Sequence, residues 1–145
     1  NICRSPAAEA ILKNLIYEKG LGDEFIVDSA GTGSWHVGKK ADSRMRCAAK
    51  QRNINITSNA RQIREDDFRK FKYIVVMDNS NFNNVINFKN RVKGSDFAKI
   101  LKIQNFSSTF AETEVPDPYF GGDAGFDHVL DILEDSVSCF LENIT

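Results

Sequence analysis

The chain has 145 residues, a formal net charge of −1, 41% apolar residues and 27% charged residues. These values are typical of one globular domain over residues 1–145, and they argue against a broad nucleic-acid-binding face, which would need an excess of Lys and Arg. No apolar run has the length of a membrane span, and three scattered cysteines and two histidines give no disulfide or metal-ligand spacing, so we expect a cytoplasmic protein without a metal.

The first predicted helix covers residues 7–17, where apolar side chains recur at intervals of three and four. Ser5 is expected to be its N-cap and Pro6 its first residue, because proline lacks the N–H that would be unpaired there. Gly20 is expected to end the helix. A strand should lead into this helix from its N-terminal side, and we expect that strand to precede residue 1.

The remaining elements are predicted from the same periodicities. In chain order they are a strand that runs into a glycine loop at 25–32, a helix at 41–53, a helical turn at 65–70, a strand at 73–78, a helix at 80–88, a strand at 98–103, a loop at 114–123 and a helix at 123–143. The run at 73–78 is continuously apolar and closed by an acid, which is typical of a strand covered on both faces. Strands alternating with helices predict an α/β fold around a parallel sheet, which binds ligands at the carboxyl ends of its strands.

The stretch NICRSPAAEA at residues 1–10 brings a thiol and a guanidinium to the start of the first helix. A helix N-terminus offers unpaired N–H groups and the positive end of the helix dipole, and Arg4 adds a planar fork that can bind two phosphate oxygens. Two interpretations of these residues stay open. They form an oxyanion cradle, or they cap a helix while Cys3 fills a small buried space.

The same stretch resembles the end of the phosphate loop of low-molecular-weight protein tyrosine phosphatases, whose motif is Cys-x-x-x-x-x-Arg-Ser/Thr followed by Pro and an acid. The segments DSAGT, WHVGKKAD, ARQI, VVMD and VPDPYFGG follow in the family's order. The resemblance implies a single-domain, flavodoxin-like α/β fold with a four-stranded parallel sheet flanked by helices. It also places the nucleophilic cysteine three residues before Asn1, so we expect a sequence truncated at its N-terminus. A chain that truly began at Asn1 would be inactive.

The resemblance implies that the protein hydrolyses phosphotyrosine monoesters on proteins or peptides through a cysteinyl-phosphate intermediate, with no cofactor, nucleic acid or membrane involved. The phosphate or a similar oxyanion would be bound by Arg4 and by the loop residues Asn1, Ile2, Cys3 and Ser5. Asp117 would be the general acid, because a tyrosine oxygen with a pKa of about 10 leaves poorly as an anion. Without the phosphate-loop motif, an Asp before a proline such as Asp117 is better explained as a turn residue.

Further roles are implied for the surroundings of the phosphate loop. Ser29 would brace that loop, whereas Ser58 stands where the family often has His, which would alter the bracing network. Cys3 aligns with the family's second loop cysteine and would form a reversible disulfide with the nucleophile. The walls of the substrate cleft would be Trp35, Tyr119 and Phe120, although core packing explains Phe120 equally well.

Two other functions remain as alternatives at this stage. An arsenate reductase of the same fold would need nearby resolving cysteines, and residues 78–90 contain none. A non-catalytic phosphate- or phosphopeptide-binding module would keep the cradle without a nucleophile, but it has little use for a proton donor such as Asp117. The pair Lys39-Lys40 is either a solvated loop or a site that attracts acidic phosphopeptides.

Overall fold

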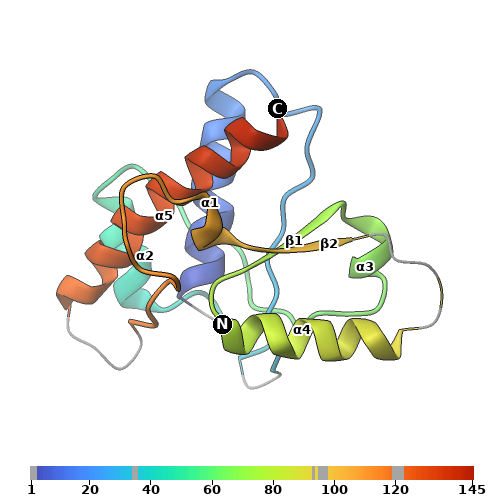
Figure 1. Ribbon diagram of the computed structural model, residues 1–145. Coiled ribbons are helices and arrows are strands. Elements are labelled where there is room, and N and C mark those ends of the chain that lie inside the picture. Colours follow the sequence, from blue (N-terminus) through green and yellow to red (C-terminus); the bar gives the residue numbers. More distant parts are fainter. Residues whose placement is uncertain (1–2, 34–35, 93, 95–97, 119–122) are drawn as a thin grey trace.

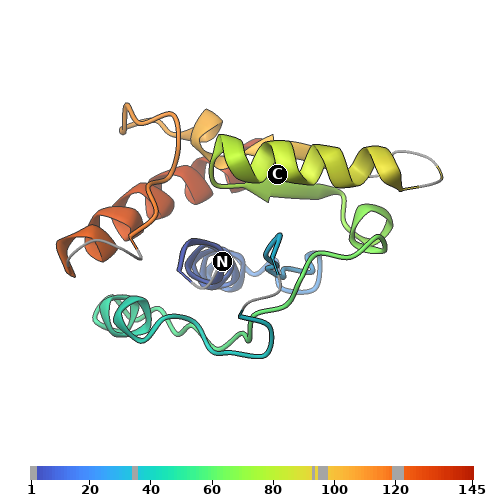
Figure 2. The same cartoon turned by 90° about the horizontal axis from the view of Figure 1, so that it is seen from below.

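The structure is a computed structural model that describes residues 3–33, 36–92, 94, 98–118 and 123–145. Helices α1, α2 and α5 pack together on one side of the sheet, and α4 lies on the other side (Figure 1; Figure 2). The elements are α1 (Arg4–Glu18), α2 (Ser43–Lys50), α3 (Asp67–Lys70), β1 (Tyr73–Val76), α4 (Asn79–Arg91), β2 (Lys99–Lys102), the 3₁₀ turn η1 (Ile103–Phe106) and α5 (Asp123–Ile144).

Strands β1 and β2 form a parallel sheet whose two faces are both covered. Tyr73 and Val75 pack against the core cluster shared by α1 and α5, whereas Ile74 and Val76 pack against α4. This alternation follows from the twofold periodicity of a strand. The predicted α/β fold with a parallel sheet flanked by helices is confirmed. The described residues contain two strands of that sheet, and the predicted number of four stays a prediction.

Helix α1 begins earlier than the sequence suggests, so the prediction of Ser5 as N-cap is wrong. The N-cap is Cys3, and it makes no side-chain capping bond. Pro6 is therefore the third helical residue and not the first, and Arg4 in the first turn has its buried side chain bonded to distant segments. The predicted end is confirmed: Gly20 has φ +70°, its N–H bonds to the carbonyl of Tyr17 (3.1 Å), and the next N–H, of Leu21, reaches back to Ile16 (2.9 Å).

The strand predicted at residues 25–32 is not formed as a hydrogen-bonded strand. Exposure alternates along it, with Phe25 and Val27 half-buried and Ile26 73% exposed, but the described contacts include only an isolated parallel bridge from Gly31 to Gln62. A strand needs a neighbour that pairs with its backbone. A cavity of about 1000 Å³, lined by residues 24–32 and 73–77, separates the segment from β1.

The other predicted helices and strands are confirmed, most of them with shifted ends. Residues 119–122 of the predicted loop at 114–123 lie outside the described residues. Helix α2 is shorter than predicted, because Asp42 caps it by accepting the N–H of Arg44 (2.8 Å) and the chain turns at Asn53, whose φ is +61°. Asp78 caps α4 by accepting the N–H of Asn81 (2.7 Å). No helix among the described residues is long and apolar enough to cross a membrane.

Candidate active site

The buried guanidinium of Arg4 joins three segments that lie far apart in the sequence. Arg4 is 4% exposed, and its Nη1 donates to Asp78 Oδ2 (2.7 Å) and to the carbonyl of Val115 (2.7 Å). Asp78 follows β1 and starts α4, whereas Val115 belongs to the loop at 114–118. The start of α1, the carboxyl end of β1 and this loop therefore meet at one side chain, where a parallel sheet is expected to bind ligands.

The loop that carries Asp117 is tied down just before that residue. The N–H of Val115 donates to the carbonyl of Met77 (2.9 Å), and Glu114 accepts the N–H of Asn79 (2.6 Å). Asp117 itself is exposed. It lines the 1000 Å³ cavity together with Cys3, Arg4 and Ser5, so the structure brings the predicted acid and the described part of the predicted phosphate loop to one cavity.

The Cys3 thiol is in an environment that keeps it protonated. Its pKa is raised to about 12, chiefly by burial and also by the charges of Asp42 and Asp117, against the opposing effect of Arg44 and Arg4. Because the thiolate is the reactive form of cysteine, Cys3 has the character of a structural residue at neutral pH.

The predicted brace Ser29 is bound to the second turn of α1. Its hydroxyl donates to Glu9 Oε1 (2.5 Å), and Glu9 is 7% exposed and also accepts a bond from Lys13 (2.6 Å). Ser29 also lines the cavity. The observed bond thus holds the second turn of α1, rather than its first residues, against the segment that contains Ser29.

Two side chains of the site were not identified from the sequence, namely Asp78 and Glu9. A signal for Asp78 was present, because an acid that closes a buried parallel strand lies at the carboxyl edge of the sheet. The sequence signal for Glu9 was weaker: it is a carboxylate that stands between the apolar residues Ala8 and Ala10 of the predicted helix.

Five of the predicted site residues lie outside the described residues. They are Asn1, Ile2, Trp35, Tyr119 and Phe120. His36, which follows one of them, lines the cavity. Within the described part of the chain, no group of three or more His, Cys, Asp and Glu side chains is arranged to hold a metal ion.

Comparison with known proteins gives matches along the whole chain. The sequence model described as low molecular weight phosphotyrosine protein phosphatase matches residues 1–145. The Schizosaccharomyces pombe protein of that name is 41% identical over 147 residues, which cover 99% of this chain and 91% of that protein. A solved protein tyrosine phosphatase from Entamoeba histolytica, with Hepes in its active site, has a TM-score of 0.90 and 43% identity and covers 99% and 90% of the two chains. A solved Drosophila arginine phosphatase has a TM-score of 0.94 and 35% identity, with 100% and 92% covered.

Proposed function

The chain belongs to the low molecular weight phosphotyrosine protein phosphatase family, and we propose that it hydrolyses protein phosphotyrosine through a cysteinyl-phosphate intermediate. The observation that carries the proposal is the anchored guanidinium of Arg4, which lies at the start of α1 and holds the loop of Asp117 through Val115. A fixed cation at a helix N-terminus is suited to the charge that develops on a transferring phosphoryl group.

In the first proposed step, the thiolate of a cysteine three residues before Asn1 attacks phosphorus in line with the tyrosine oxygen. The S–P bond forms as the P–O bond breaks, and Asp117 gives its proton to the departing phenolate. Arg4 and the N–H groups of the loop bind the equatorial phosphate oxygens during this displacement.

In the second step, water attacks the phosphocysteine while the Asp117 carboxylate accepts a proton from that water. The S–P bond breaks, inorganic phosphate is released, and the thiolate is restored. The hydroxyl of Ser5, which lines the same cavity, donates a hydrogen bond to the sulfur and eases its departure. Cys3 stays protonated through both steps because burial raises its pKa to about 12.

The strand expected before α1 would fit into the large cavity beside α1. The 1000 Å³ cavity is lined by residues 24–32 on one side, by 73–77 on the other and by α1. A strand inserted there would pair with both segments and end at the phosphate loop.

The proposal is tested by phosphatase assays of the full-length protein in the presence of EDTA. We expect turnover of a phosphotyrosine peptide without added metal, and little turnover of phosphoarginine, the substrate class in the name of the Drosophila relative. Arsenate reduction with a thiol donor tests the alternative enzyme. Loss of phosphotyrosine turnover on chelation would contradict the metal-free mechanism.

The role of Asp117 is tested by Asp117→Ala with aryl phosphates that differ in leaving-group pKa. The value of kcat/KM should fall by roughly 10²–10⁴-fold for phosphotyrosine, whose leaving oxygen needs a proton, and far less for p-nitrophenyl phosphate, whose leaving group is a weak base. An equal loss for all leaving groups would remove Asp117 from the acid role.

A further inference from the structure

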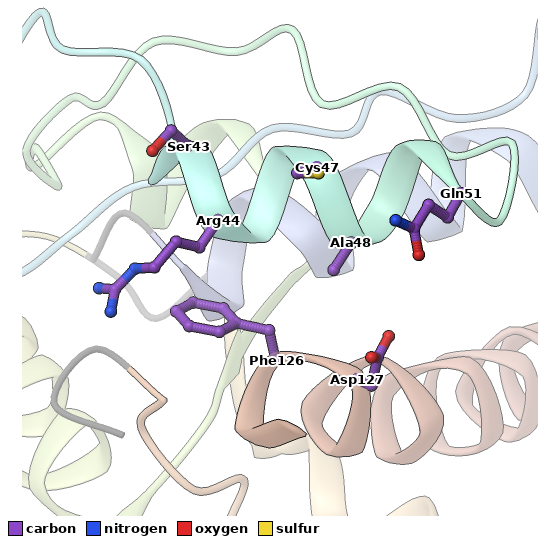
Figure 3. A pocket seen from close by; sticks show the side chains of 7 residues that line it. All are labelled: Ser43, Arg44, Cys47, Ala48, Gln51, Phe126 and Asp127. Atoms are coloured by element: carbon purple, nitrogen blue, oxygen red, sulfur yellow. The ribbon is translucent and has the colours of Figure 1, made fainter. Parts of the chain in front are cut away.

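Helices α2 and α5 lie beside an open groove along part of their length. The groove has a volume of about 320 Å³, and its lining residues, shown in Figure 3, are Ser43, Arg44, Cys47, Ala48, Gln51, Phe126 and Asp127. Two arginines bridge the pair. Arg44 in the first turn of α2 contacts Phe126, and Arg52, just beyond the end of α2, binds Asp127, Asp131 and Glu134 of α5.

The guanidinium of Arg44 makes a two-point contact with Asp42, and the Arg44 side chain is 40% exposed. Asp42 accepts from Nε with Oδ1 (3.2 Å) and from Nη2 with Oδ2 (3.1 Å), and the same carboxylate caps α2 through the Arg44 N–H. The guanidinium carbon lies 4.7 Å from the centroid of the Phe126 ring, and Figure 3 shows the side chain reaching past that ring. Phe126 is 1% exposed, so this stacking acts on a fully packed residue.

Phe126 is connected to the loop of Asp117 through its neighbour in the chain. A Cβ built on Gly125 would lie 3.7 Å from the Cβ of Pro118, which places the first turn of α5 directly against that proline. Pro118 is buried and immediately follows Asp117. The backbone that carries Asp117 is thus confined on one side by the tie at Val115 and on the other by the start of α5.

We propose that Arg44 is a positioning residue for Asp117. Clamped by Asp42 and stacked on Phe126, it holds the start of α5 against Pro118 and so fixes the direction from which the Asp117 carboxyl meets the leaving oxygen. This inference rests on the proposed acid role of Asp117. A small displacement of a proton donor is costly, because proton transfer requires hydrogen-bond distance to the leaving oxygen.

The test compares Arg44→Gln with Arg52→Gln in the full-length enzyme. Both changes remove an arginine that bridges to α5, but only Arg44 reaches the turn that packs on Pro118. We expect Arg44→Gln to lower kcat/KM about 10-fold for phosphotyrosine and less than about 2-fold for p-nitrophenyl phosphate. Arg52→Gln should leave the ratio of the two values unchanged. Arg44→Lys, which keeps the charge but not the two-point clamp, should recover only part of the loss.

The double variant with Asp117→Ala separates positioning from other effects. If Arg44 acts through Asp117, Arg44→Gln should cause no further loss in the Asp117→Ala background. The inference would be overturned if Arg44→Gln lowered kcat/KM equally for all leaving groups, or if it caused its full loss in the Asp117→Ala protein as well. The proposed function would be unaffected by either result. If the loss of kcat/KM caused by Asp117→Ala were itself the same for all leaving groups, the acid role would be overturned and this inference with it.

A second variant keeps the test independent of the folding of Arg44→Gln. Phe126→Leu retains an apolar side chain in the core but removes the ring on which the guanidinium stacks. Thermal unfolding first establishes that the variant is folded. Its loss of kcat/KM should then show the same dependence on the leaving group, and a uniform loss would contradict the inference.

Discussion

At the scale of single residues, the two carboxylate oxygens of Asp78 have separate tasks. Oδ2 pairs with Arg4, and Oδ1 accepts the N–H of Asn81 and so caps α4. The Arg4 side chain is 5% exposed and that of Asp78 19%, so the pair is largely shielded from water. Since a shielded cation needs its partner, Asp78 couples the direction of the Arg4 guanidinium to the start of α4.

Substitution of Asp78 should separate these two tasks. Asp78→Ala removes both and should lower the free energy of unfolding by about 2–4 kcal/mol, from the lost cap and the lost charged hydrogen bond. Asp78→Asn keeps a capping oxygen and should cost less, while kcat/KM falls about 10-fold because the guanidinium is held less firmly. Urea unfolding and steady-state kinetics measure the two effects. Wild-type kcat/KM in Asp78→Asn would show that the negative charge does not orient Arg4.

The buried Cys3 thiol should make stability depend on pH in the alkaline range. Its pKa rises from 9.0 to about 12 on folding, chiefly by burial, so between these values the folded state keeps a proton that the unfolded state releases. Stability contributed by Cys3 is therefore fully present below pH 9 and is lost as the pH rises toward 12.

The expected result is a steeper decline of the free energy of unfolding above pH 9 in the wild type than in Cys3→Ala. The comparison of slopes is needed because tyrosines and lysines also titrate in this range. The free energy of unfolding is measured by urea unfolding at several pH values. An equally steep decline with pH in the two proteins would contradict a raised pKa of Cys3.

At the scale of elements, the end of α1 depends on a left-handed residue. Gly20 has φ +70°, a conformation that side chains with a Cβ rarely adopt, whereas Gly22, two residues later, does not have a positive φ. A Cβ at either position would meet nothing within 4 Å, so the two glycines differ in backbone conformation rather than in space.

This pair provides a matched test of the helix end. Gly20→Ala should lower the free energy of unfolding by about 1–2 kcal/mol, the cost of a left-handed L-residue. Gly22→Ala should leave it unchanged or raise it by up to about 1 kcal/mol, because it restricts only the unfolded chain. Denaturant unfolding measures both, and equal effects would show that the conformation of Gly20 is not what ends α1.

At the scale of the whole molecule, the cavity between residues 24–32 and β1 is the feature that bears on the complete sheet. In the full-length protein we expect the strand before α1 to lie there and to pair its backbone with residues 25–30 and with Tyr73–Val76. Amide hydrogen exchange should then be slow in residues 25–30, as in a central part of a sheet. Exchange at the rate of an open loop in residues 25–30 would contradict this placement of the strand.

The candidate site was predictable where local motifs carry chemistry. Arg4 was identified from its place at the start of a helix, and Asp117 through the resemblance to the phosphatase family; both line the same cavity. Asp78 and Glu9 were not identified, because their roles depend on which side chains fold against them from 74 and 20 residues away. A carboxylate in a sequence does not show which cation or hydroxyl it will meet.

The sequence by itself determined the α/β class, the order of helices and the end of α1, because hydrophobic periodicity and a left-handed glycine act within a few residues. Only the tertiary structure showed that α1 begins at Arg4, before the Ser5-Pro6 signal, and that the Arg4 side chain is bonded to distant segments. The tertiary structure also showed that residues 25–32 form no hydrogen-bonded strand pair within the described chain, because a strand requires a neighbouring strand that pairs with its backbone. Contacts between distant segments are fixed by packing, which local preferences cannot specify.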